Sequence, residues 1–203
     1  MTWGEYIQSL LKRPPMLFST ATTGVNSDDC LLAVSYTIIK SPRESGTVFY
    51  AAPASCALNG VDYHKITMHT LSTYGLQAEE FSEEVNRLFK ENTAFSYNPA
   101  FQVSALTDMA DCTPGYVHDL PVLMKLAMSR LALPAEDLDK ICTLPELESL
   151  AKRMAGQPLT FKRLMRSCNI VVDPYTDELP VKTNVQILTQ LWDQLCDIPL
   201  VTF

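Results

Sequence analysis

The stretch Phe18-Ser19-Thr20-Ala21-Thr22-Thr23-Gly24 decides the fold that we expect for this chain. It follows a short apolar run at 16–18, which predicts a β-strand leading into a Thr-Thr-Gly turn. The polar run 26–29 predicts a turn, and a long strand rich in Leu, Val, Tyr and Ile follows at 30–40. After a further turn, a third strand is expected at 47–52. This spacing predicts a three-stranded antiparallel meander.

Beyond the meander the pattern changes to helices that alternate with short strands. Apolar residues recur at helical spacing in most segments, and brief apolar runs lie between them. The expected helices cover 3–12, 67–74, 78–91, 99–108, 120–131, 144–155, 160–166 and 183–196, and the expected strands cover 93–97 and 116–118. This order favours an α/β fold with a mixed sheet of five strands, namely the meander and two parallel strands, flanked by helices. We expect one domain over 1–203, with a helical N-terminal extension at 1–13.

Composition predicts a protein with a sizeable core and no membrane span. The chain has 203 residues, of which 47% are hydrophobic. No run approaches the roughly 20 apolar residues that cross a bilayer, and no secretory signal opens the chain. A cytoplasmic location is therefore the default expectation. The six cysteines are scattered without a Cys-x-x-Cys pair, which favours free, reduced and mostly buried thiols.

The charge pattern gives no strong nucleic-acid signal. The net charge is −7, whereas non-specific nucleic-acid binding usually needs a basic stripe. Basic residues are densest at 152–153 and 162–166, where they are interleaved with Leu and Met. We interpret them as the solvated faces of amphipathic helices. The acidic charge favours a protein partner over DNA or RNA.

The opening stretch resembles the first motif of the DEDD-type 3'-5' exonucleases, which include the bacterial polymerase III epsilon proofreading subunits. That motif reads D-x-E-T-T-G at the end of the first strand. The Thr22-Thr23-Gly24 frame is present, but Ser19 stands in place of the Asp and Ala21 in place of the Glu. The resemblance implies a ribonuclease H-like fold. It also implies that two metal-binding carboxylates are missing.

Two further segments resemble the same family and lie in the expected order. His64-Lys65-Ile66-Thr67 is similar to the H-x-I-T that follows the third strand, and Asn98-Pro99-Ala100-Phe101-Gln102 is similar to N-x-x-F-D in the second motif. In the second segment, Gln102 replaces a metal-binding Asp. The resemblance implies that substrate-binding positions remain; these are Thr22, Thr23, Gly24, His64, Ile66, Asn98 and Phe101.

The third motif, H-x-A-x-x-D, is expected at the head of the last helix. The best register aligns the apolar positions Leu188, Leu191 and Leu195, and it places Pro180 at the His and Val185 at the Asp. No histidine follows His118 in the chain, so the general base of the family is absent in any register.

These losses predict that the chain lacks the family's metal chemistry. The family uses two Mg²⁺ or Mn²⁺ ions, and such hard ions need anionic oxygen ligands. Ser19, Ala21, Gln102 and Val185 offer none. We expect no catalytic residue, no bound metal and no cofactor. The leading hypothesis is an inactive exonuclease-like protein that binds a protein partner or, weakly, single-stranded nucleic acid.

Two alternatives stay open. The first is an active metal-dependent 3'-5' exonuclease whose ligands are displaced to other acids, such as Asp28, Asp29, Asp108, Asp111 and Asp119. We expect these acids to cap helices and to solvate turns instead. The second alternative is a structural or regulatory domain without nucleic-acid contact.

Overall fold

The computed structural model describes residues 1–24, 29–51, 56, 58, 60–129, 131–155, 159–172 and 178–202. Its strands are β1 (Pro15–Thr22), β2 (Leu31–Ile38), β3 (Glu44–Tyr50), β4 (Gly75–Leu76), β5 (Thr93–Ser96) and β6 (Val117–Asp119). Its helices are α1 (Trp3–Ser9), α2 (Val61–His64), α3 (Met68–Tyr74), α4 (Ala78–Glu91), α5 (Pro99–Ala110), α6 (Leu120–Met128), α7 (Ala135–Asp139), α8 (Leu144–Ala155), α9 (Phe161–Ser167) and α10 (Pro180–Asp197).

The strands form one mixed sheet in the order β4-β3-β2-β1-β5-β6. Antiparallel pairing joins β1 to β2 and β2 to β3, which confirms the meander. Parallel pairing joins β1 to β5 and β5 to β6, as expected. The sheet has six strands instead of five, because β4 adds a two-residue parallel pair beside β3. The expected turn at 26–29 lies mostly outside the described residues.

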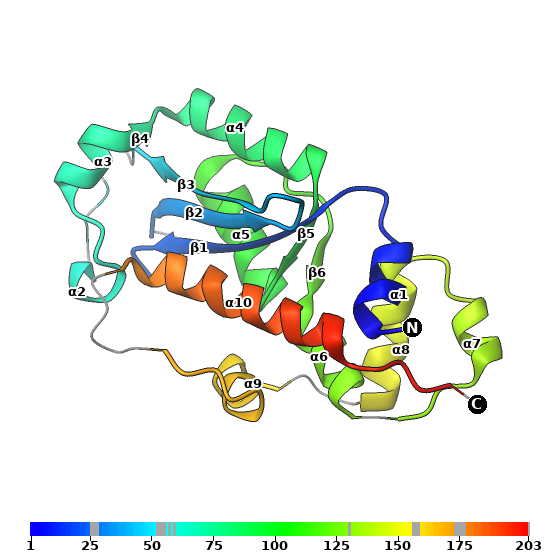
Figure 1. Cartoon of the computed structure of the whole chain (residues 1–203). Coiled ribbons are helices and arrows are strands. Elements are labelled where there is room, and N and C mark those ends of the chain that lie inside the picture. The colour runs from blue at the N-terminus through cyan, green and yellow to red at the C-terminus, as the bar shows by residue number, and fades with distance from the viewer. Residues whose placement is uncertain are drawn as a thin grey trace.

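The alternation of side chains along β1 divides the core into two layers. Met16 and Phe18 pack with residues of α4 and α5, whereas Leu17 packs with residues of α10, α6 and α8. Ser19 and Ala21 fall on the α10 side by the same period. Figure 1 shows α10 running along this face, with α4 and α5 on the opposite side of the sheet. The period of β1 thus fixes which side chains face the start of α10.

Several local signals set the helix starts. Thr67 caps α3, since its hydroxyl accepts a hydrogen bond from the Thr70 N–H at 3.2 Å. Asp119 caps α6 in the same way. α5 begins at Pro99 after Asn98 adopts a left-handed conformation with φ of 49°. That turn directs α5 back across the sheet from the end of β5.

The N-terminal segment is part of the packed core. Trp3, Tyr6 and Ile7 of α1 are buried in the cluster that also contains α10 residues. The main chain of Trp3 donates to the Ile198 carbonyl at 2.9 Å, next to the end of α10. The helix is shorter than the expected range 3–12. Within the described residues, no helix is both long and apolar enough to cross a membrane.

The expectation of free thiols is wrong for two cysteines. Cys30 and Cys56 form a disulfide across a sequence separation of 26 residues. Cys112, Cys142, Cys168 and Cys196 are free, as expected. The disulfide was not predictable from spacing, since the fold alone brings the start of β2 beside Cys56.

Candidate functional site

A cavity of about 510 Å³ opens where β1 and β5 end and α10 begins. We call it the β1 pocket. Its lining residues are Thr20, Ala21, Thr22, Thr23, Gly24, Gly60, Tyr63, His64, Tyr97, Asn98, Phe101, Pro180, Val181 and Asn184. The carboxyl ends of the parallel strands β1 and β5 meet at this edge of the sheet, where α/β folds commonly place their sites. The three separated motifs therefore converge here.

Ser19 and Gln102 are fully buried beside this pocket, and both are neutral. Gln102 comes from the first turn of α5, and its Oε1 accepts from the Thr20 N–H at 2.8 Å and from the Thr20 hydroxyl at 2.9 Å. These bonds hold α5 against β1. Gln102 thus links the first and second motifs by hydrogen bonds.

The last helix contributes Asn184 in place of Val185. The amide of Asn184 donates toward the Ser19 hydroxyl at 3.4 Å and to the Tyr97 hydroxyl at 3.1 Å. Val185 lines a different cavity, between α10 and the β2–β3 face. Asn184 therefore joins Val185 as a candidate for the third-motif position, and the register stays a prediction. The apolar spacing of α10 predicted its buried face but does not decide between these two neighbours.

The phenol of Tyr97 lies among these neutral side chains. Burial raises the pKa of Tyr97, while hydrogen bonding by Ser19, Gln102 and Asn184 acts in the opposite direction. The ring also stacks on Phe161 with centroids 4.2 Å apart and planes 14° from parallel. A tyrosine hydroxyl thus lies among the first-, second- and third-motif residues. Sequence reasoning missed Tyr97, although it stands next to Asn98 of the second motif.

Most of the predicted substrate-binding residues line the β1 pocket. Thr22, Thr23, Gly24, His64, Asn98 and Phe101 all contribute to its wall. Ile66 does not, because its side chain is fully buried in the small cluster with Ala21 and Val181. Its main-chain N–H donates to His64 Nδ1 at 3.0 Å, which leaves the ring proton of neutral His64 on Nε2. Ile66 therefore positions His64.

The side chains around the pocket do not fit Mg²⁺ or Mn²⁺. None of the described lining residues is Asp, Glu, Lys or Arg. Ser19, Gln102 and Asn184 offer neutral oxygens, and Ala21 offers none, whereas these ions prefer carboxylates. Across the described ranges, no group of three or more His, Cys, Asp or Glu side chains is arranged to hold a metal.

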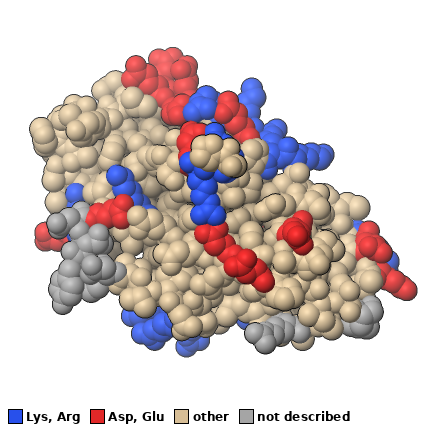
Figure 2. All heavy atoms as spheres, viewed as in Figure 1, with Lys and Arg blue, Asp and Glu red and all other residues tan. Residues whose placement is uncertain are grey.

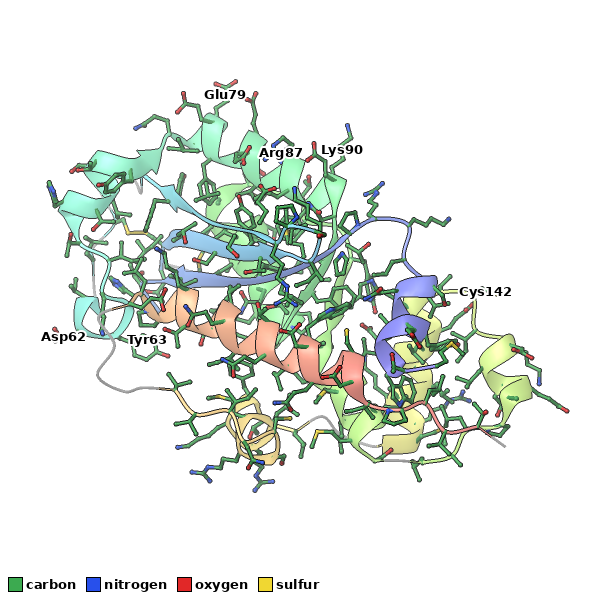
Figure 3. All side chains as sticks on the ribbon, viewed as in Figure 1. Asp62, Tyr63, Glu79, Arg87, Lys90 and Cys142 are labelled. Carbon is green, nitrogen blue, oxygen red and sulfur yellow. A yellow bond between two sulfur atoms is a disulfide. The ribbon has the colours of Figure 1, made fainter. Side chains whose placement is uncertain are left out.

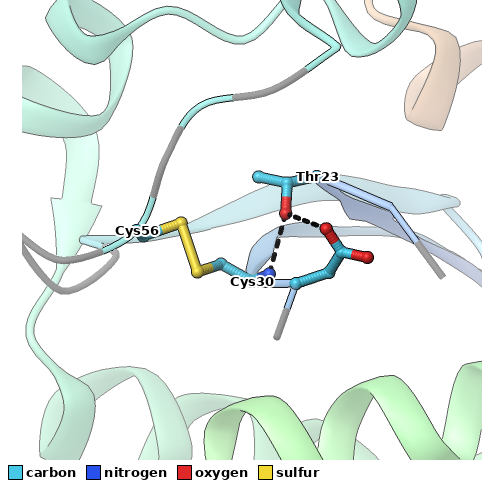
Figure 4. The surroundings of a disulfide bond; sticks show 4 residues. Thr23, Cys30 and Cys56 are labelled. Carbon is cyan, nitrogen blue, oxygen red and sulfur yellow. Dashed lines mark hydrogen bonds between the residues drawn. A yellow bond between two sulfur atoms is a disulfide. The ribbon is translucent and has the colours of Figure 1, made fainter. Parts of the chain in front are cut away.

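The disulfide lies at the rim of this pocket. Figure 4 shows the Thr23 hydroxyl accepting from the Cys30 N–H at 2.9 Å and donating to Asp29 Oδ1 at 3.0 Å. Cys30 is bonded in turn to Cys56. Asp29, one of the candidate displaced ligands, is thus engaged with the Thr-Thr-Gly turn. The same small network fixes the end of β1.

A second cavity of about 590 Å³ lies on the other side of Tyr97, and we call it the β6 pocket. Its wall includes a buried carboxylate, Glu148, with 2% of its surface exposed. Glu148 accepts from the Tyr116 hydroxyl at 2.8 Å, from His118 Nδ1 at 3.0 Å and from the Asp119 N–H at 2.9 Å. Sequence reasoning missed this cluster, because Glu148 reads as an ordinary charged position of an amphipathic helix.

Comparison with known proteins gives a fold likeness only. No family model matches the chain, and no curated protein matches its sequence. Among solved structures, product-bound exonuclease I shares the fold with a TM-score of 0.53 and 13% identity over 91% of this chain. E. coli exonuclease I bound to a dA16 oligonucleotide gives 0.52 and 14% identity over 92% of this chain.

The chain spans less than half of those proteins, namely 46% and 42% of their lengths. The resemblance to the DEDD 3'-5' exonucleases and the ribonuclease H-like fold are confirmed at the level of the fold. A closer relation to the polymerase III epsilon subunits stays a prediction. This chain therefore has the fold of exonuclease I.

Proposed function

We propose that this protein is an exonuclease-like binding module without nuclease activity. The observation that carries the proposal is the composition of the motif positions. Ser19, Ala21, Gln102 and Asn184 come together without a carboxylate, and the Tyr97 hydroxyl lies among them. A site of this composition binds through hydrogen bonds and apolar contact.

The physical reason is the missing charge. Two divalent ions that clamp a phosphate need several anionic oxygens, because the ions repel each other at close range. Neutral amide and hydroxyl groups leave that repulsion uncompensated. Metal stabilisation supplies several kcal/mol of a phosphoryl-transfer barrier, and each ~1.4 kcal/mol changes the rate tenfold. Activity by this route is then negligible.

The surface supports a protein partner as the first expectation. The net charge is −7, and Figure 2 shows basic and acidic groups mixed on the face in view. A basic group at the lower edge of Figure 2 lies where Figure 1 draws α9, whose Lys162, Arg163 and Arg166 are exposed. Three cations permit at most weak, salt-sensitive binding of single-stranded nucleic acid. The expected cytoplasmic location is weakened by the Cys30–Cys56 disulfide, since stable disulfides are rare there.

Metal binding and cleavage provide the decisive test. We expect wild-type protein to leave 3'-labelled single-stranded DNA intact with Mg²⁺ or Mn²⁺. We also expect Mn²⁺ titration to show no tight site. The combined Ser19→Asp, Ala21→Glu, Gln102→Asp and Asn184→Asp variant should gain Mn²⁺ affinity, because it restores four carboxylates. Metal-dependent shortening by wild type, abolished by a chelator, would establish the alternative of an active exonuclease with displaced ligands.

A further inference from the structure

The described wall of the β1 pocket has no charged side chain, but it offers both apolar contact and hydrogen bonding. Its floor is apolar at Ala21 and Val181, which belong to one buried cluster. Asn184 faces the pocket and donates its amide to Ser19 and Tyr97. Among the described residues none donates to its Oδ1, so this carbonyl oxygen is available to an N–H donor. The cavity therefore combines an apolar floor with one hydrogen-bond acceptor.

Aromatic side chains form the walls of the same cavity. Tyr63, Tyr97 and Phe101 all line it. Burial raises the pKa of the Tyr97 phenol, and the charge of Tyr63 acts in the same direction. Figure 3 shows Asp62 and Tyr63 leaving α2 in opposite directions, so the charged neighbour points away from Tyr63. Such walls favour a flat aromatic group.

The segment that carries Tyr63 also exposes apolar surface beside the pocket. Tyr63 is 82% exposed, Met68 is 60% exposed and Val61 is 37% exposed. Tyr63 lines the pocket, Val61 follows the lining residue Gly60 in α2, and Met68 begins α3. We call these three exposed side chains the α2 patch. A small ligand would fill the cavity but would leave this patch in water. A protein segment would cover both.

We propose that the β1 pocket receives an uncharged aromatic side chain of a partner protein, and that the α2 patch packs against the chain on either side of it. This inference rests on the proposed binding function. An indole fits the chemistry well, because its ring suits the aromatic walls and its N–H suits Asn184 Oδ1. A phosphate fits poorly, since the described wall supplies no cation.

The test uses the full-length protein and N-acetyl-tryptophanamide as an uncharged probe. NMR titration follows the amide signals of Gly24, Gly60 and the Asn184 side chain, which all report on the pocket wall. We expect these signals to shift with a dissociation constant of about 1 mM or lower, as suits a single small aromatic group. Thymidine 5'-monophosphate with Mg²⁺ should bind more weakly.

Matched variants test whether the probe binds in the β1 pocket. Tyr63→Ala should weaken the probe about tenfold, because one aromatic wall is lost. Tyr74→Ala is the control, since Tyr74 is similarly exposed at 66% but does not line the pocket. Ala21→Glu should also weaken the probe, because it places a charge on the apolar floor.

The inference is overturned if the probe leaves the pocket signals unchanged, if Tyr74→Ala weakens it as much as Tyr63→Ala does, or if the nucleotide binds more tightly. Nuclease activity is a separate readout that decides the proposed function. An inactive protein that ignores the probe would refute only this inference.

Discussion

Replacing Glu148 with Ala should destabilise the protein strongly, although Glu148 lies outside the β1 pocket. The carboxylate is 2% exposed and accepts three hydrogen bonds, from Tyr116, His118 and the Asp119 main chain. The exposed Tyr116 can turn to water after the substitution. His118 is buried and Asp119 is half-buried, so neither donor is freely hydrated, and each such orphaned group costs about 1–3 kcal/mol. We therefore expect Glu148→Ala to lower the free energy of unfolding by about 3 kcal/mol.

The Glu148→Gln variant removes the charge of this side chain but keeps its shape. The amide oxygen can still accept from His118 and Asp119, and the amide group can donate to the Tyr116 hydroxyl. The expected cost is about 1 kcal/mol, which is the difference between charged and neutral hydrogen bonds. A cost equal to that of Glu148→Ala would refute this account of the cluster.

Because of the same carboxylate, the free energy of unfolding should depend on pH. Burial alone would raise the pKa of Glu148, but hydrogen bonds from His118, Tyr116 and the Asp119 main chain lower it below the ordinary value of 4.5. As pH falls, the unfolded chain then takes up the proton before the folded protein does. The stabilisation is present above pH 4.5 and is lost as pH falls through the lower folded pKa.

Urea denaturation from pH 3 to pH 7 measures both effects. The difference in unfolding free energy between wild type and Glu148→Gln should shrink below about pH 4.5. A difference that stays constant across that range would show that the charge of Glu148 contributes nothing.

Three further predictions concern the site and its rim. Reducing the Cys30–Cys56 disulfide should lower the free energy of unfolding by up to about 3.5 kcal/mol, because it releases a loop of 26 residues. Denaturation with and without reductant measures this change, and an unchanged midpoint would contradict it. Tyr97→Phe should lower the free energy of unfolding by about 1–2 kcal/mol in urea denaturation, because the Asn184 amide loses the shorter of its two hydrogen bonds; a neutral result would mean that water replaces the phenol. Phe161→Ala should lower the melting temperature by more than the lost burial of its ring explains, since the stack on Tyr97 adds about 0.5–1.5 kcal/mol of stability. In the Tyr97→Leu background this additional loss should vanish.

The sequence predicted the sheet because strand signals are local. The strand-forming residues of 30–40 and the spacing of the turns around them indicated the meander, and α4 was predicted over its full range of 78–91. The missed elements are short. β4 has two residues, α2 has four and α7 has five, so none of them is long enough to show a helical or strand period. Such elements are defined by tertiary contacts.

The site was predictable in its composition but not in its contacts. Ser19, Ala21 and Gln102 could be assigned from motif frames. The choice between Asn184 and Val185 depends on the rotation of one helix against the sheet, which apolar spacing sets only to within a residue. Tyr97, Glu148 and the disulfide were missed because each depends on segments brought together from distant parts of the chain.

The Tyr97 phenol and its neutral neighbours oppose the introduction of a single carboxylate beside the β1 pocket. A first carboxylate at Ser19 or Gln102 would be buried without a cation and would lose hydrogen bonds that now join β1 to α5 and α10. A second would add repulsion to the first. We therefore expect each single acidic substitution to lower the free energy of unfolding. The hydrogen bonds that join β1 to α5 and α10 thus also keep the pocket neutral.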